Sequence, residues 1–268
     1  MNSREPRARG PGPPRSPVRF RLFTAMISFL ALAGPAAAGE AVVAVASNFA
    51  EVAERLEAEF ERDSGHTVTF VAGSTGKLYA QIGTGAPFDA FLAADQARPE
   101  RLVEEGKAVA GSRFTYATGL LTLWSPEPGR VGEDGAATLR QGAFRRLSIA
   151  NPALAPYGAA AQQTLEKLGL WEGLKDKLVM GETVGQAHAM VASGNAELGF
   201  VALSYVQSPR TRTPGSRWDV PPGLHAPIRQ DAVLLARAAG NPAARDFLDY
   251  LRSARAKALI ETYGYGVE

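Results

Sequence analysis

Short apolar runs of strand length alternate with amphipathic segments along most of the chain. Residues 41–46 and 67–72 are apolar or β-branched runs typical of buried strands. Between them, apolar residues recur every three or four positions from Phe49 to Phe60, which predicts an amphipathic helix. Apolar strands that alternate with helices are typical of an α/β fold built on parallel sheets.

The alternation continues to the end of the chain, interrupted by Pro/Gly-rich stretches at 125–135 and 209–227. We therefore expect two α/β lobes with parallel-rich sheets, joined by two crossing strands. The first lobe is discontinuous (39–118 plus 228–268) and the second is continuous (119–227). Hinge motion at the crossings can close such lobes on a ligand. The pattern predicts further strands at 88–93, 119–124, 147–150, 198–203 and 231–236, and helices at 77–83, 96–105, 158–168, 186–193 and after Asn241-Pro242.

The first 38 residues have a different character from the rest of the chain. Six arginines and one acid, Glu5, precede an apolar run at 22–34, and Ala36-Ala37-Ala38 follows. A basic region, a short apolar region and an Ala-x-Ala end are typical of a secretory signal peptide, here cut before Gly39. The alternative is a membrane anchor, but the apolar run is too short to span a bilayer.

Removal of this leader changes the charge of the protein. The whole chain has 29 basic and 27 acidic residues and a formal net charge of +2. The leader holds six of the basic residues and one acid, so 23 basic and 26 acidic residues remain, a net charge of −3. Basic composition is therefore no argument for nucleic-acid binding. The chain has no cysteine, which excludes disulfides, thiolate metal sites and cysteine nucleophiles.

Four predicted strand-to-helix turns share small or hydroxyl-bearing residues. They are Ser47-Asn48, Gly73-Ser74-Thr75-Gly76, Pro156-Tyr157-Gly158 and Thr183-Val184-Gly185. The unpaired N–H groups at a helix start favour anions, and ligands of open α/β sheets bind at the carboxyl ends of the strands. The alternative is ordinary helix capping, for which Asn48 with Glu51 has capping-box spacing. The residues alone thus predict an anion or small polar ligand between the lobes.

Six segments together resemble the periplasmic molybdate-binding proteins of ABC importers, which have the type II periplasmic binding fold. The resemblance covers about residues 41–267. It implies a periplasmic, non-enzymatic protein that captures molybdate and tungstate between two lobes and delivers them to a membrane permease. It also implies a monomer without cofactor or nucleic-acid partner. The segments are 45–49, 73–82, 85–95, 151–158, 184–187 and 199–203.

The same resemblance implies how the anion is held. In the family, hydroxyls and backbone N–H groups bind the oxyanion, without a cationic side chain and without a directly coordinated metal. Many members have a ligand tyrosine where this chain has Ala202. We expect Asn48 to supply the replacement donor. The implied ligand residues are Ser47, Asn48, Thr75 with Ser74 as its neighbour, and the backbone N–H groups of Tyr157 and Val184.

Three other functions compete with this interpretation. One is a binding protein for another tetrahedral oxyanion, such as sulfate or phosphate. A second is a secreted α/β hydrolase using Ser74 or Ser47, but the second turn is not a Gly-x-Ser-x-Gly nucleophile elbow. A third is a cytoplasmic effector-sensing domain, against which the leader and the lack of a DNA-binding segment argue. The histidines His66, His188 and His225 have no metal-ligand spacing.

Overall fold

A computed structural model describes residues 1–3, 10, 12, 38–211 and 213–268 of the chain. Nearly all of the predicted signal peptide therefore lies outside the described residues. From Glu40 onward the chain folds into two five-stranded sheets with helices on both faces, an α/β architecture as predicted. Among residues 38–211 and 213–268, no helix is long and apolar enough to cross a membrane.

The first sheet combines strands from the two ends of the folded region. Its strand order is β2-β1-β3-β10-β4. β1 pairs in parallel with β2 and β3, whereas β10 is antiparallel to both of its neighbours. The strands are β1 (Glu40–Ala46), β2 (Thr67–Gly73), β3 (Ala90–Leu92), β4 (Phe114–Gly119) and β10 (Ile228–Leu234).

The second sheet repeats this arrangement with the middle of the chain. Its order is β7-β6-β8-β5-β9, with β6 parallel to β7 and β8, and β5 antiparallel to both of its neighbours. Each sheet thus holds one antiparallel strand in the same position, although the sequence shows no repeat. The strands are β5 (Leu121–Ser125), β6 (Leu147–Ala150), β7 (Leu178–Gly181), β8 (Leu198–Ala202) and β9 (Ser216–Asp219).

The chain passes between the sheets twice. It leaves the first sheet at the end of β4 and enters the second at the start of β5, with only Leu120 between them. It returns from β9 to β10 through residues 220–227. The antiparallel strand of each sheet, β5 or β10, is therefore the strand that follows a crossing.

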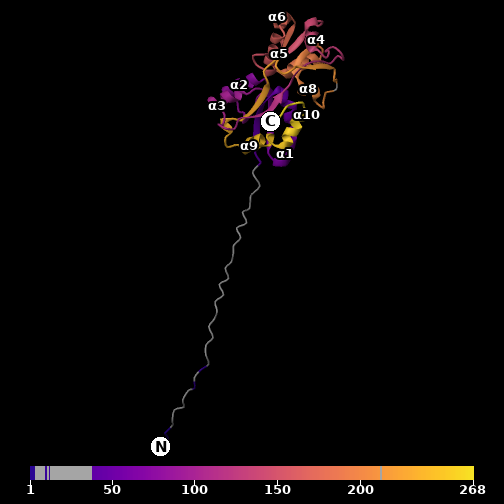
Figure 1. The fold of residues 1–268 in the computed structure, drawn as a ribbon. Helices are drawn as coiled ribbons and strands as arrows, with labels where there is room; N and C mark the ends of the chain where they lie inside the picture. Colours follow the sequence, from indigo (N-terminus) through magenta and orange to yellow (C-terminus); the bar gives the residue numbers. More distant parts are fainter. Residues whose placement is uncertain (4–9, 11, 13–37, 212) are drawn as a thin grey trace. The chain divides into compact units, whose positions relative to one another are not determined.

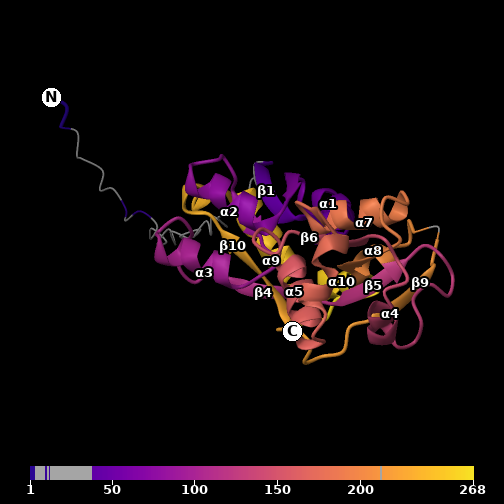
Figure 2. The same ribbon diagram turned by 90° about the horizontal axis from the view of Figure 1, so that it is seen from above.

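Helices cover both faces of each sheet (Figures 1 and 2). One face of the first sheet packs on α1, α9 and α10, and the other on α2 and α3. In Figure 1 these helices surround the lower part of the folded region, and α4, α5, α6 and α8 lie above. The helices are α1 (Ala50–Ser64), α2 (Thr75–Gly83), α3 (Ala97–Glu104), α4 (Gly135–Gln141), α5 (Pro156–Lys167), α6 (Trp171–Leu174), α7 (Val184–Ala192), α8 (Leu203–Gln207), α9 (Pro242–Leu251) and α10 (Ala254–Thr262), with 3₁₀ turns η1 (Ser47–Phe49), η2 (Lys175–Lys177) and η3 (Ala236–Ala238).

The predicted strands and helices exist, with ends displaced by a few residues. The predicted cap of the helix that starts at Pro242 is confirmed, because Asn241 Oδ1 accepts from the N–H groups of Ala243 and Ala244. The predicted strand at 231–236 was placed too late, since β10 begins at Ile228. The sequence pattern missed several short elements. They are β4, β7, β9, α4, α6, α8 and α10.

Candidate functional site

The four predicted turns meet at one small cavity between the two sheets. The cavity measures about 10 Å³, room for roughly one water molecule. Two turns come from the first sheet, at the ends of β1 and β2, and two from the second, at the starts of α5 and α7. All six predicted ligand residues line it. The lining consists of Ala46, Ser47, Asn48, Gly73, Ser74, Thr75, Ala94, Ala155, Pro156, Tyr157 and Val184.

Ser74 presents a free hydroxyl to this cavity. It occupies the N-cap position of α2, yet its side chain makes no capping hydrogen bond. Its Oγ is buried and has no hydrogen-bond partner in the described structure, and the residue is 2% exposed. A buried hydroxyl without a partner is energetically unfavourable, and its place in the cavity lining makes Ser74 a candidate to bind a ligand. The capping alternative is therefore wrong for Ser74.

Thr75 also lines the cavity, and its hydroxyl differs from that of Ser74 in having one partner. Its Oγ1 accepts a hydrogen bond from the N–H of Ala94 at 3.1 Å, so the hydroxyl already has a structural role. The Thr75 hydroxyl proton has no acceptor among the described residues, so it can be donated to an anion, whereas the Ser74 hydroxyl has no partner of either kind. The sequence could not distinguish them, because Ala94 approaches only in the folded chain.

Ser47 links the two sides of the cavity. Its Oγ accepts from the N–H of Gly185 at 3.4 Å, and its carbonyl oxygen accepts from the Tyr205 hydroxyl at 2.7 Å. Both partners lie in helices beside the second sheet, Gly185 in α7 and Tyr205 in α8. The Ser47 hydroxyl proton has no acceptor among the described residues, so this proton can be donated to an anion.

The side chain of Asn48 has different partners from those expected. Its Nδ2 donates to Gln230 Oε1 at 2.8 Å and to the Tyr265 hydroxyl at 3.1 Å. Both amide hydrogens are thus engaged, so a donor from Asn48 in place of the tyrosine missing at Ala202 would be its backbone N–H. The expected capping box is also wrong, because Glu51 accepts from Ser208 instead. Asn48 retains its backbone N–H, which lies at the start of η1.

The second sheet contributes backbone donors. At the start of α7, the N–H of Gly185 donates to Ser47 and that of Gln186 to Thr183 Oγ1. The N–H of Val184, the first residue of α7, has no hydrogen-bond acceptor among the described residues. At the start of α5, Pro156 has no N–H, and the next donor is that of Tyr157. Each helix start therefore directs a partly positive N–H toward the cavity.

The Tyr157 side chain extends to the crossing between the sheets. The ring is buried, and its hydroxyl has no hydrogen-bond partner of acceptable geometry, although Tyr265 lies nearby. A Cβ atom at Gly119, the last residue of β4, would overlap this hydroxyl. Burial raises the pKa of Tyr157, and it raises the pKa of Tyr265 to about 12. Both phenols therefore stay neutral in the physiological range.

No charged side chain lines the cavity. The nearest cations are already paired: Lys77 Nζ lies 3.1 Å from a Glu182 carboxylate oxygen, and Arg98 pairs with Asp95. In the part of the chain that the structure describes, no cluster of histidine and carboxylate side chains could hold a metal ion. The arrangement can hold a small anion by hydrogen bonds from neutral donors.

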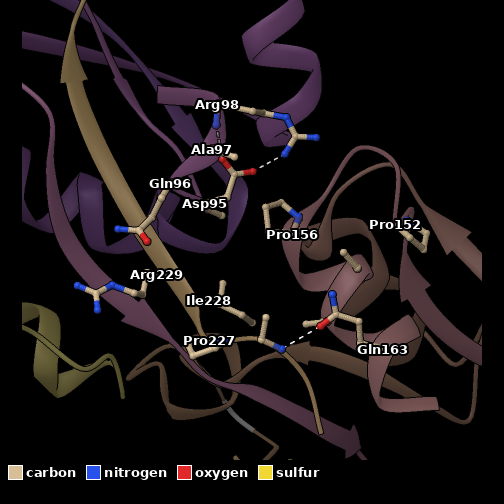
Figure 3. Close-up of a pocket in the computed structure, with 14 residues that line it drawn as sticks. Asp95, Gln96, Ala97, Arg98, Pro152, Pro156, Gln163, Pro227, Ile228 and Arg229 are labelled. Atoms are coloured by element: carbon tan, nitrogen blue, oxygen red, sulfur yellow. Dashed lines mark hydrogen bonds and ion pairs between the residues drawn. The ribbon is translucent and has the colours of Figure 1, made fainter. Parts of the chain in front are cut away.

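A larger cavity of about 350 Å³ adjoins the small one and shares Ala94 and Pro156 with it. Figure 3 shows that Asp95, Arg98 and Gln96 approach it from the first sheet, and Pro156 and Gln163 from α5. Its polar side chains are satisfied by one another or by neighbours: the Arg98 guanidinium by Asp95, and Gln163 Oε1 by the N–H of Ala226. The smaller cavity is therefore the better candidate site.

Comparison with known proteins agrees with this geometry. The family model for bacterial extracellular solute-binding proteins matches residues 41–266. The chain is 54% identical over 237 residues to the molybdate-binding protein ModA of Azotobacter vinelandii, covering 88% of this chain and 94% of that protein. It is 48% identical over 245 residues to ModA of Rhodobacter capsulatus, covering 91% and 95%.

Structural comparison gives the same result. The periplasmic molybdate-binding protein of Azotobacter vinelandii superposes with a TM-score of 0.82 at 41% identity, covering 85% of this chain and 99% of that one. These relatives are solute-binding proteins and not enzymes. The predicted fold and family are therefore confirmed, and the chain belongs to the bacterial extracellular solute-binding proteins, as a close relative of the ModA molybdate-binding proteins.

Proposed function

We propose that this protein captures molybdate or tungstate between its two sheets and delivers the anion to the membrane permease of an ABC importer. The observation that carries the proposal is the unpartnered, buried Ser74 hydroxyl in a cavity lined by neutral donors from both sheets. The two ModA relatives, at 54% and 48% identity, support molybdate as the anion.

Neutral donors are sufficient to hold a dianion in such a site. We assign the hydroxyls of Ser47 and Ser74 and the backbone N–H groups of Asn48, Tyr157 and Val184 as the ligands. Each hydrogen bond to a charged group contributes roughly 1.5–3 kcal/mol. Several of them, with two helix dipoles in a site from which water is excluded, hold the anion without a lysine or arginine. Thr75 orients the turn through Ala94, and its hydroxyl proton is available as a further donor to the anion.

Anion size is the basis of the proposed selectivity. Sulfate is smaller than molybdate and would leave some of these hydrogen bonds stretched. A site closed from both sides discriminates by size because its donors belong to two rigid elements. Another tetrahedral oxyanion, such as sulfate or phosphate, is the alternative ligand.

A serine hydrolase is not supported. Neither Ser47 Oγ nor Ser74 Oγ hydrogen bonds to a histidine or a carboxylate in the described residues. A serine nucleophile needs such a base to accept its proton. The relatives are also solute-binding proteins.

We further propose that residues 39–118 with 228–268 and residues 119–227 move as two lobes. The cavity has room for about one water molecule, which is too little for an anion with four oxygens. The lobes must therefore part for the anion to enter, with the crossings at Leu120 and at 220–227 as hinges.

The location follows from the family and from the leader. Members of this family act outside the cytoplasm, and we propose that a signal peptide cut before Gly39 exports a monomer to the periplasm. The proposed cut fits the fold, because the carbonyl of Gly39 already accepts from the N–H of Thr67 at 2.9 Å. N-terminal sequencing of exported protein tests this, and an intact Met1 would refute it.

Calorimetric titration of the mature protein tests the ligand. We expect molybdate and tungstate to bind at least about 100-fold more tightly than sulfate, a difference of roughly 2.7 kcal/mol. Equal affinities for the three anions would refute size selection. Binding of none of them would refute the proposed function.

A further inference from the structure

Three contacts join the two lobes at the rim of the cavity. The N–H of Gly76 donates to the carbonyl oxygen of Leu154 at 2.9 Å. Arg98 Nη2 donates to the carbonyl oxygen of Ala153 at 3.3 Å, and Lys77 pairs with Glu182. In each pair, the donor or cation lies in the lobe of residues 39–118 and 228–268, and its partner lies in the lobe of residues 119–227. We call the Gly76–Leu154 pair the rim contact.

The rim contact uses a donor that the helix cannot satisfy. Gly76 is the second residue of α2, where the backbone N–H has no intrahelical acceptor. Its acceptor, Leu154 O, belongs to the opposite lobe, so this hydrogen bond exists only when the lobes are closed. The adjacent N-cap residue of the same helix is Ser74, the proposed anion ligand. Closure and anion binding therefore use neighbouring groups at one helix start.

The receiving loop is held in a fixed conformation. The N–H groups of Leu154 and Ala155 donate to Asn151 O at 3.0 and 2.9 Å, and that of Ala153 donates to Asn151 Oδ1 at 3.0 Å. Asn151 is itself anchored by its N–H to Gly181 O at 2.7 Å. These bonds leave the carbonyl oxygens of Ala153 and Leu154 to accept from the other lobe. The loop cannot easily retreat from an obstacle at residue 76.

Close approach explains the glycine at position 76. Its φ is not positive, so backbone freedom is not the reason. A Cβ atom at Gly76 would lie 3.0 Å from Leu154 O and 3.2 Å from Leu154 Cα. It would also lie 3.2 Å from Arg98 Nη2, and Figure 3 shows the Arg98 guanidinium held by Asp95 beside this rim. Two of these three contacts are to backbone atoms of the opposite lobe.

We propose that Gly76 is a positioning residue for closure: it lets the two lobes meet backbone to backbone, and this contact sets how long the anion stays bound. The inference rests on the proposed function. A side chain at position 76 holds the rim open by a few tenths of an ångström. Anion release then becomes faster, although no ligand group has been altered.

A matched pair of variants tests the proposal. Gly76→Ala and Gly83→Ala lie in the same helix, and a Cβ at Gly83 meets nothing nearer than Lys107 Nζ at 3.8 Å. Alanine favours a helix over glycine, so both variants should fold, and the melting temperature without anion checks this. We expect Gly76→Ala to speed molybdate dissociation about tenfold, with association nearly unchanged, and Gly76→Val to have a larger effect. Gly83→Ala should leave both rates unchanged.

A second measurement does not depend on the identity of the ligand. The chain has no cysteine, so Glu104→Cys and Glu172→Cys place one spin label on each lobe. Gly76→Ala should lower the population of the short, closed-lobe label distance relative to the wild type, and Gly83→Ala should not. A wild-type distance distribution in Gly76→Ala would overturn the proposal even if molybdate did not bind. If the wild type binds molybdate and Gly76→Ala releases it at the wild-type rate, the proposal is equally wrong.

Discussion

The two sides of the cavity offer an anion different kinds of donor. The first sheet presents mainly side-chain hydroxyls, those of Ser47, Ser74 and Thr75, together with the backbone N–H of Asn48, on turns that follow β1 and β2. The second presents backbone N–H groups at the starts of α5 and α7, from residues whose side chains, Tyr157 and Val184, are buried. A hydroxyl is removed by a single substitution, whereas a backbone N–H is lost only when the helix start itself changes. Single substitutions on the side of the first sheet should therefore weaken anion binding more than those on the side of the second sheet.

The largest effect should come from a negative charge on the hydroxyl side. Ser74→Asp preserves an N-cap residue, so the fold should tolerate it. The carboxylate would repel a dianion by about 4 kcal/mol per unit charge at roughly 4 Å and an effective dielectric near 20. We expect molybdate affinity, measured by calorimetry, to fall by at least about three orders of magnitude.

The control for this charge is Ser253→Asp. Ser253 caps α10 through its Oγ, which accepts from the N–H of Ala256, and it lies outside the cavity lining. Its variant should bind molybdate like the wild type. Wild-type affinity in Ser74→Asp would mean that Ser74 does not face the anion.

Removing one hydroxyl should have a smaller effect, and it separates Ser74 from Thr75. Ser74→Ala loses one hydrogen bond to a charged partner, so affinity should fall about 10- to 150-fold with little change in stability. Thr75→Val instead leaves the buried N–H of Ala94 without its acceptor. We expect its free energy of unfolding to fall by about 1–3 kcal/mol, measured by urea titration. If Thr75→Val weakens binding more than Ser74→Ala does, the assignment of the two residues is reversed.

On the backbone side, removal of a side-chain hydroxyl should change little. Tyr157→Phe keeps the N–H at the start of α5 and deletes a hydroxyl that has no partner. We expect the affinity for molybdate to stay within about threefold of wild type. The melting temperature should be unchanged or higher, because no hydrogen bond is lost. A large loss of affinity would show that the phenol, and not only the backbone, acts in binding.

The smallest expected effect is a pH dependence of the free energy of unfolding, caused by His188 on the side of the second sheet. His188, on α7, stacks between Trp124 and Tyr205, and its Nε2 is buried without a partner. Burial lowers the pKa of His188, so the folded protein holds its proton less tightly than the unfolded chain. The free energy of unfolding should therefore decline as pH falls through the ordinary histidine range and below it.

Urea unfolding at about pH 7.5 and about pH 5 measures this dependence. His188→Phe keeps the aromatic stack and removes the titrating group. The variant should lose less stability than the wild type between the two conditions. Identical losses in both proteins would assign the dependence to other groups.

Local patterns were enough to predict the long elements. β1 is buried on both faces and has a continuous apolar sequence, and α1 buries Val52, Ala53, Leu56 and Phe60 at helical spacing. The edge strand β9 and the five-residue α8 are too short to show a period. Each depends on contacts made by the folded chain and was therefore missed.

The site was predictable as a set of turns but not as a set of hydrogen bonds. Small residues and hydroxyls at helix starts indicated all four turns. Whether a given hydroxyl or amide is free depends on distant residues. Asn48 is engaged by Gln230 and Tyr265, which are 182 and 217 positions away in the sequence. No local pattern contains that information, so the sequence could not tell which donor of Asn48 is free.

The contact between the Tyr157 hydroxyl and Gly119 limits how this family can diverge. Any side chain at position 119 would occupy the space that the phenol fills. The two positions, 38 apart in the sequence, therefore cannot vary independently. Among relatives, a residue with a side chain at the position of Gly119 should occur together with a residue smaller than tyrosine at the position of Tyr157. Aligned sequences of the family should thus show correlated substitution between the last residue before the first crossing and the residue whose N–H we assign to the anion.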